Sequence, residues 1–208
     1  MVVGLPVTVG MFAHARAEQF TGENREMHMA IRPRPWTRSD LERIPDDTNK
    51  YEVVRGELFV TPAPSTRHER LLRILADLIR PYVSRDRLGV IGLGHAALVF
   101  EESEVQPDLV VRVDPGPTVE RWEEMPTPIL VVEVLSRSTR QRDLRAKREL
   151  YADAGIDEYW IVDGDARSIR RFRVGTDEVL SDRLEWSPVG TTASLTIDLV
   201  DYFRRALG

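Results

Sequence analysis

The run Ile129-Leu130-Val131-Val132-Glu133-Val134-Leu135 sets one carboxylate among six aliphatic side chains. So many β-branched and apolar residues in a row are typical of a strand that is covered on both faces of its sheet. Burying an ionised carboxylate there without compensation costs several kcal/mol. We therefore expect Glu133 to meet a cation, a proton or a metal ion.

A second acidic residue stands at the entry of the preceding aliphatic strand. Asp108 follows Gln106-Pro107 and comes directly before Leu109-Val110-Val111. If the two strands pair, the carboxylates of Asp108 and Glu133 repel each other, and a hard divalent cation that bridges their oxygens relieves the repulsion. The chain has no cysteine, so oxygen or imidazole ligands would have to hold any metal ion.

The residues after the Glu133 strand predict a helix that begins at Ser138 or Asp143 and ends at Gly155. Apolar residues recur on one face of this helix at roughly 100° per residue, and Lys147 projects close to the centre of that face. Lys147 either extends its ammonium past its neighbours to water or meets Glu133. The projection directs three charged side chains away from that face: Arg142, Arg145 and Glu149.

Two elements precede these strands. Residues 51–54 and 58–60 predict a β-hairpin around Arg55-Gly56, because glycine readily takes the positive φ of a tight turn. Ser65 predicts the start of a helix that runs to about residue 83, with an apolar stripe at helical spacing. His68 falls on this stripe, where it is either a hydrogen-bonded histidine of the first turn or a ligand or base.

The remaining pattern predicts further strands at residues 90–100, 105–113, 158–162, 169–174, 179–184 and 193–197, with short helices at 40–44 and 199–207. This order predicts an α/β protein with a mixed β-sheet flanked by helices, an N-terminal β-hairpin and C-terminal strands. Residues 1–34 show no sustained periodicity, so we expect a flexible N-terminal extension followed by a single domain over 35–208.

Composition favours a soluble protein. The 208 residues are 42% hydrophobic and 30% charged, and no run approaches the roughly 18 to 20 apolar residues of a membrane span. Absence of cysteine fits a reducing cytoplasm. The net charge of −5 argues against a large electrostatic footprint for nucleic acid, although it does not exclude a local basic face. Of 29 basic residues only Lys50 and Lys147 are lysines, so each lysine needs a reason.

Six segments, in order, resemble the Uma-type restriction endonuclease family of the PD-(D/E)XK nuclease superfamily, over about residues 36–174. The segments are Tyr51-Glu52-Val53-Val54-Arg55-Gly56-Glu57-Leu58, Pro64-Ser65-Thr66-Arg67-His68, Pro107-Asp108-Leu109-Val110-Val111, Val132-Glu133-Val134-Leu135-Ser136-Arg137-Ser138-Thr139, Lys147-Arg148-Glu149-Leu150-Tyr151 and Ala154-Gly155-Ile156-Asp157-Glu158-Tyr159-Trp160-Ile161-Val162-Asp163. Each segment alone is a weak signal, whereas six in order are fairly specific.

The resemblance implies a restriction-endonuclease-like core in which Asp108 and Glu133 bind Mg²⁺ or Mn²⁺ and Lys147 is the basic catalytic residue. It also implies a further acidic residue near the metal, for which Glu52 and Glu57 are candidates, although either could be a solvated charge. His68 would lie at the mouth of the same cleft. Leu135 stands where the superfamily pattern has its lysine, so Lys147 would have to reach the site from the following helix.

The leading hypothesis is a metal-dependent endonuclease of double-stranded DNA, which would favour a homodimer. One alternative is a catalytically inactive nuclease fold that binds nucleic acid or protein. Another is that Glu133 and Lys147 form only a buried structural ion pair. Four arginines near the Glu133 strand could contact phosphates or form a solvated helix face: Arg137, Arg140, Arg142 and Arg145.

Overall fold

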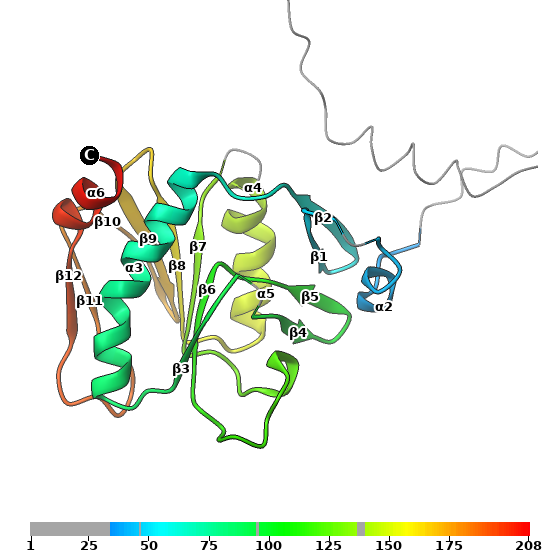
Figure 1. The fold of residues 1–208 in the computed structure, drawn as a ribbon, viewed down its shortest axis with the longest axis horizontal. Coiled ribbons are helices and arrows are strands. Elements are labelled where there is room, and N and C mark those ends of the chain that lie inside the picture. Colours follow the sequence, from blue (N-terminus) through cyan, green and yellow to red (C-terminus); the bar gives the residue numbers. More distant parts are fainter. Residues whose placement is uncertain (1–33, 46, 95, 137–139) are drawn as a thin grey trace, which may run out of the picture. The chain divides into compact units, whose positions relative to one another are not determined.

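A six-stranded mixed sheet runs through the centre of the fold, with the Glu133 strand in its interior (Figure 1). The computed structural model describes residues 34–45, 47–94, 96–136 and 140–208. Strand order in the sheet is β10-β9-β8-β7-β6-β3, and only the β7 and β8 pair is parallel. The strands are β3 (Val90–Leu93), β6 (Leu109–Arg112), β7 (Leu130–Val134), β8 (Glu158–Asp163), β9 (Ser168–Arg173) and β10 (Thr176–Leu180).

A second sheet of four strands, in the order β2-β1-β5-β4, contains the predicted hairpin. Its turn residues Arg55 and Gly56 have φ of 49° and 84°, the two positive angles that a type I′ turn requires. The strands are β1 (Lys50–Val54), β2 (Glu57–Thr61), β4 (Leu98–Phe100) and β5 (Ser103–Val105). A third sheet pairs β11 (Arg183–Trp186) with β12 (Leu195–Asp198).

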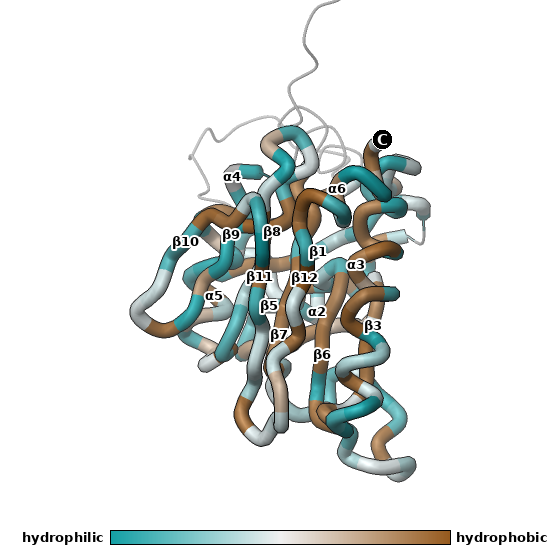
Figure 2. Tube along the Cα trace, turned by 90° about the vertical axis from the view of Figure 1, so that its left-hand side faces the viewer, coloured by the Kyte–Doolittle hydropathy of each residue, from teal (hydrophilic) through white to brown (hydrophobic). Residues whose placement is uncertain are grey.

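Helices cover both faces of the six-stranded sheet (Figure 1). On one face lie α3 (Thr66–Arg85) and α6 (Leu199–Leu207), and on the other the continuous segment α4 (Arg140–Arg142), η3 (Asp143–Lys147, π-helical) and α5 (Arg148–Asp153). Figure 2 shows apolar colour along β6, while α3 alternates between apolar and polar colour. The short helices α2 (Arg38–Leu41) and η2 (Trp122–Glu124) complete the described elements.

The alternation of β7 directs Glu133 toward α5. Val132 and Val134 pack in the apolar cluster that contains α3 and α6, whereas Val131 packs in the cluster that contains Tyr151 of α5. Because successive side chains of a strand point to opposite faces, Glu133 shares the face of Val131. The strand is buried along its whole length, as its apolar sequence predicts.

Three strand predictions had wrong boundaries. Residues 90–100 form two strands in different sheets because the chain turns at Gly94, where φ is +65°. Residues 105–113 also divide between two sheets, since Gln106 and Pro107 lie between β5 and β6. Residues 179–184 cover the end of β10 and the start of β11. In each case apolar periodicity continues across a bend, so it does not reveal the bend.

Ser65 caps α3 as predicted, accepting a hydrogen bond from the backbone N–H of His68. The C-terminal helix spans residues 199–207, as predicted. The short helix expected at 40–44 lies at Arg38–Leu41 instead, and Thr37 is its N-cap. Of the expected extension 1–34, residues 1–33 lie outside the described residues, as does the candidate cap Ser138. Within the described ranges, every helix is too short or too polar to cross a lipid bilayer.

Candidate active site

Asp108 and Glu133 lie at the same end of two paired strands. β6 and β7 are antiparallel with Leu109 opposite Val132, so the two acidic residues sit on neighbouring strands one step further along. The backbone N–H of Val134 donates to Asp108 Oδ2 at 2.8 Å. The expected pairing of the two strands is therefore confirmed.

Glu133 meets an ammonium and a phenol. Lys147 Nζ lies 2.6 Å from Glu133 Oε1, and the Tyr151 hydroxyl donates to the same oxygen at 3.1 Å. Lys147 is 0% exposed, so the expectation that it faces inward toward Glu133 is confirmed, and extension of the ammonium to water is wrong. Burial raises the pKa of Glu133 to about 7, with the charges of Asp108 and Asp143 adding to the rise and Lys147 opposing it. Burial lowers the pKa of Lys147, but the charges of Glu133 and Glu52 raise this pKa by more than burial lowers it. The net pKa lies above the usual value for lysine, so the ammonium stays charged.

Glu52 is the hairpin carboxylate that joins this cluster. Its Oε1 accepts from Lys147 Nζ at 2.8 Å and from the Gln106 backbone N–H at 2.8 Å. Burial raises the pKa of Glu52, yet Lys147, Lys50 and Arg142 outweigh burial, so this pKa falls below its usual value. Glu57, the other candidate, is exposed on β2.

Arg142 was predicted to point away from the core, and this prediction was wrong. Its guanidinium is buried, donates from Nη1 to Thr61 Oγ1 at 2.9 Å, and lies 3.2 Å from Glu52 Oε2. The π-helical turn η3 explains the error, because i to i+5 bonding stacks residues five apart and turns Arg142 toward the face of Lys147. Such turns are frequent at functional sites.

Asp108 is held between an imidazole and an ammonium. His68 Nε2 lies 3.3 Å from Asp108 Oδ2, and Lys50 Nζ lies 3.5 Å from Oδ1. Burial raises the pKa of Asp108, but His68, Lys50 and the Val134 N–H outweigh burial and hold this pKa far below its usual range. For His68 the effects have opposite signs. Burial lowers the pKa of His68, but the hydrogen bond and charge of Asp108 outweigh burial, so this pKa lies above its usual value.

Lys50 was not predicted as a site residue. The available signal was composition: both lysines of the chain, among 29 basic residues, lie within 3.5 Å of a carboxylate of this cluster. Tyr151 was also missed, because its position on the apolar stripe of the helix explained it without a hydrogen bond to Glu133.

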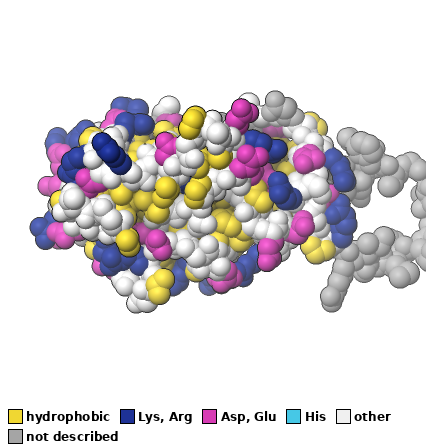
Figure 3. Space-filling model, turned by 90° about the horizontal axis from the view of Figure 1, so that it is seen from below, with side chains coloured by type: hydrophobic (Ala, Val, Ile, Leu, Met, Phe, Trp, Pro, Cys, Tyr) yellow, Lys and Arg dark blue, Asp and Glu magenta, His cyan; other side chains and the backbone are white. Residues whose placement is uncertain are grey.

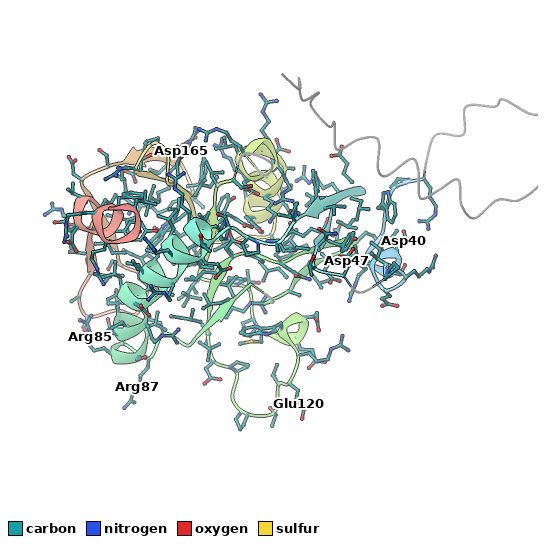
Figure 4. The ribbon with its side chains drawn as sticks, turned by 45° about the horizontal axis from the view of Figure 1, so that its top comes forward. Asp40, Asp47, Arg85, Arg87, Glu120 and Asp165 are labelled. Carbon is teal, nitrogen blue, oxygen red and sulfur yellow. The ribbon has the colours of Figure 1, made fainter. Side chains whose placement is uncertain are left out.

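A cavity of about 1070 Å³ opens beside these residues. Asp108, Glu133, His68, Lys50 and Arg142 line it, whereas neither Lys147 nor Glu52 is among its described lining residues. Figure 4 labels two further acidic wall residues, Asp47 next to the hairpin and Asp165 in the loop after β8.

The cavity is not a uniformly basic groove. Arg140, at its edge, pairs with Asp163 at 2.9 Å, and Arg67 pairs with Asp165 at 2.6 Å. Arg145 is exposed as predicted, and Arg137 lies outside the described residues. On the face of the molecule seen in Figure 3, cationic and acidic side chains also interleave along the edges.

Asp108 and Glu133 carry oxygen atoms of the kind that a hard divalent cation prefers as ligands. Burial is the main cause of the raised pKa of Glu133, and the charge of Asp108 adds to the rise. Both residues border the cavity. Mg²⁺ is commonly held by one or two carboxylates together with waters and substrate phosphates. The described part of the chain contains no group of three or more His, Asp or Glu side chains arranged to hold a metal ion.

A protein-family model described as Uma2, putative restriction endonuclease, matches residues 38–201. The chain belongs to the Uma2 family. This match confirms the resemblance that six sequence segments indicate. A crystal structure of a putative nuclease belonging to DUF820 from Anabaena variabilis ATCC 29413 is similar, with a TM-score of 0.67 and 21% sequence identity, covering 83% of this chain and 100% of the other. That likeness supports the nuclease-like α/β fold of the Uma2 chain. No curated protein matches it.

Proposed function

We propose that this Uma2-family chain is a metal-dependent DNA endonuclease, in which Asp108 and Glu133 bind Mg²⁺ or Mn²⁺. The observation that carries the proposal is the pair of carboxylates on neighbouring strands, both at the wall of one cavity. In a family described as putative restriction endonuclease, the fitting reaction is hydrolysis of a phosphodiester. Water adds to phosphorus, one ester P–O bond breaks, and the leaving oxygen takes up a proton.

A bound divalent ion supplies Lewis acidity toward the phosphate and lowers the pKa of water. Other residues of the chain hold the two carboxylates that would bind this ion. Lys147 favours the ionised form of Glu133 through its 2.6 Å contact, and the Val134 N–H fixes one oxygen of Asp108. Because Lys147 is fully buried, we assign it the role of holding Glu133 and Glu52. It acts on the attacking water only through these carboxylates.

A plasmid-nicking assay tests the proposal. Wild type should nick supercoiled DNA in Mg²⁺ or Mn²⁺ and not in EDTA, and Asp108→Asn and Glu133→Gln should each abolish nicking. Glu158→Gln is the matched control, because Glu158 is another buried glutamate on the adjacent strand β8 and does not line the cavity. Full nicking by Asp108→Asn would refute the proposal, since it would reveal a contaminant or another site.

The substrate form and assembly are proposed as duplex DNA and a homodimer. Cleavage of both strands of a duplex at one position is most simply achieved by two copies related by a two-fold axis. Light scattering together with the ratio of linear to nicked plasmid tests this part. A strictly monomeric protein that yields only nicks would contradict it and leave the metal site intact.

The second candidate is a nuclease fold without catalysis that binds nucleic acid or protein. The complete sequestration of Lys147 between Glu52 and Glu133 favours it, because an ammonium held by two carboxylates also serves as a structural ion pair. Wild type that is inactive with Mg²⁺ and Mn²⁺, yet binds duplex DNA in calcium, would support this candidate over the enzyme.

A further inference from the structure

The two lysines of the chain occupy different sides of the acidic cluster. Lys147 is 0% exposed, and its ammonium contacts the carboxylates of Glu52 and Glu133. The Lys50 side chain is 20% exposed and lines the cavity. Lys50 is therefore the lysine whose ammonium can reach a molecule that enters the cavity.

The surroundings of Lys50 fix its ammonium beside Asp108 without using its full donor capacity. Nζ donates to the Gln106 carbonyl oxygen at 2.9 Å and lies 3.5 Å from Asp108 Oδ1. An ammonium has three N–H donors, so with these two partners among the described residues one donor is left for the cavity. Lys50 begins β1 and pairs with Thr61 of β2, which gives its backbone a defined position at the cavity wall.

We propose that Lys50 is a catalytic residue of this site, donating to a non-bridging oxygen of the scissile phosphate. This inference rests on the proposed nuclease function. As water adds to phosphorus and the ester P–O bond breaks, negative charge grows on the non-bridging oxygens, and a fixed ammonium stabilises that charge without giving up its proton. Lys147 is then a positioning residue that orients Glu133.

The chemistry of lysine suits this task. Its ammonium is a compact point charge on a flexible stem, whereas arginine presents a broad planar fork. Of the 29 basic residues only Lys50 and Lys147 are lysines. The lysine beside Asp108 therefore occupies a position where a point charge suits the space between a carboxylate and a phosphate better than an arginine would. Arg142, the cavity cation nearest the Glu52 carboxylate, is already engaged by Thr61 and Asp143.

A competing role for Lys50 is to neutralise Asp108 until a metal ion displaces its ammonium. The two roles differ in their effect on the cleavage step. If Lys50 only takes the place of the metal ion beside Asp108, its ammonium competes with that ion. Removing the ammonium would then strengthen Mn²⁺ binding and leave the cleavage step unchanged. A phosphate-binding ammonium would slow cleavage and weaken binding of the nucleic acid.

The experiment compares Lys50→Met and Lys50→Arg with Arg38→Met. Arg38 is the matched control, because it also lines the cavity but pairs with Glu104 at 3.9 Å, away from Asp108. Three quantities are measured on the full chain: the single-turnover cleavage rate of a labelled duplex in Mg²⁺, the Mn²⁺ affinity by calorimetry, and binding of the duplex in Ca²⁺ by fluorescence anisotropy.

We expect Lys50→Met to lower the single-turnover rate in saturating Mg²⁺ by about 10²- to 10³-fold and duplex affinity by about tenfold. Mn²⁺ affinity should rise, because the variant removes a positive charge 3.5 Å from Asp108 Oδ1. Lys50→Arg should recover part of the rate, and Arg38→Met should behave as wild type. Cleavage by Lys50→Met at the wild-type rate, with tighter Mn²⁺ binding, would overturn the inference while the nuclease function stands. Conversely, wild type that does not cleave but binds duplex in a Lys50-dependent way would overturn the nuclease function and support the phosphate contact.

Discussion

Replacing Lys147 with Met should destabilise the protein strongly, because two buried carboxylates share one ammonium. Its Nζ lies 2.8 Å from Glu52 Oε1 and 2.6 Å from Glu133 Oε1, and Met keeps a long side chain while removing the charge. Removing one partner of a buried ion pair costs about 3 to 5 kcal/mol. Single domains unfold with a free energy of about 5 to 15 kcal/mol, so this substitution removes a large share of the total.

The loss should grow as the pH rises. Glu133 has a pKa of about 7 even with Lys147 beside it, and without the ammonium this pKa should rise further. In the folded variant Glu133 would bind a proton at pH 6, which relieves the unpaired charge. At pH 8.5 the folded state must either ionise Glu133 without a partner or hold a proton that the unfolded chain releases, so the free energy of unfolding falls.

A second substitution provides the internal control. Adding Glu133→Gln to Lys147→Met removes the stranded charge, while Glu52 keeps its hydrogen bond from the Gln106 N–H and its proximity to Arg142. The double variant should recover to within about 2 kcal/mol of wild type. Urea denaturation in EDTA at pH 6 and pH 8.5 measures all three proteins. A loss below about 1 kcal/mol for Lys147→Met at pH 8.5, or a double variant no more stable than the single one, would refute the buried pair.

Three further predictions concern groups around the same cavity. Folding raises the pKa of Glu133 from 4.5 to about 7. The contribution of Glu133 to the free energy of unfolding is therefore largest at low pH, and it declines by about 3 kcal/mol as the pH rises from 4.5 to 7. The difference between wild-type and Glu133→Gln denaturation curves across pH should show this decline, and a flat difference would contradict it. His68 should titrate above its ordinary pKa of 6.5 because of Asp108, and NMR titration of Asp108→Asn should show that pKa lowered. An unchanged His68 pKa in Asp108→Asn would count against their contact. Ser65→Ala should cost about 1 kcal/mol through loss of the α3 cap, measured by urea denaturation, and a neutral effect would show that the cap contributes nothing.

The local features of the fold follow from short stretches of sequence. The hairpin around Arg55-Gly56, the cap at Ser65 and the buried strand around Glu133 each depend on neighbouring residues and on apolar period. Those signals are local, so they are present in the sequence. The strand boundaries near Gly94 and Pro107 were harder, because an apolar pattern looks the same on both sides of a bend that transfers the chain to another sheet.

The site was predictable in its members more than in its contacts. The sequence pointed to Glu133 as a carboxylate in an apolar strand and to Asp108 as an acid at a strand entry. It pointed to Lys147 as an inward-facing lysine of the next helix. Arg142 was misplaced because projection at a uniform helical angle does not anticipate a π-helical turn. Lys50 was missed because it stands at the start of β1 without any motif, and only the fold brings its ammonium next to Gln106 and Asp108.

The amino-acid sequence alone established that Glu133 needs a partner, because the cost of burying its charge depends only on the apolar residues beside it. Which groups meet that need depends on strand pairing and helix packing between segments far apart in the chain. The tertiary structure showed that Lys147 and Tyr151 contact Glu133, that Glu52 shares the same ammonium, and that Lys50 alone of the two lysines faces the cavity. Distances between residues 50, 52, 108, 133 and 147 are set by these non-local contacts, and no local periodicity encodes them.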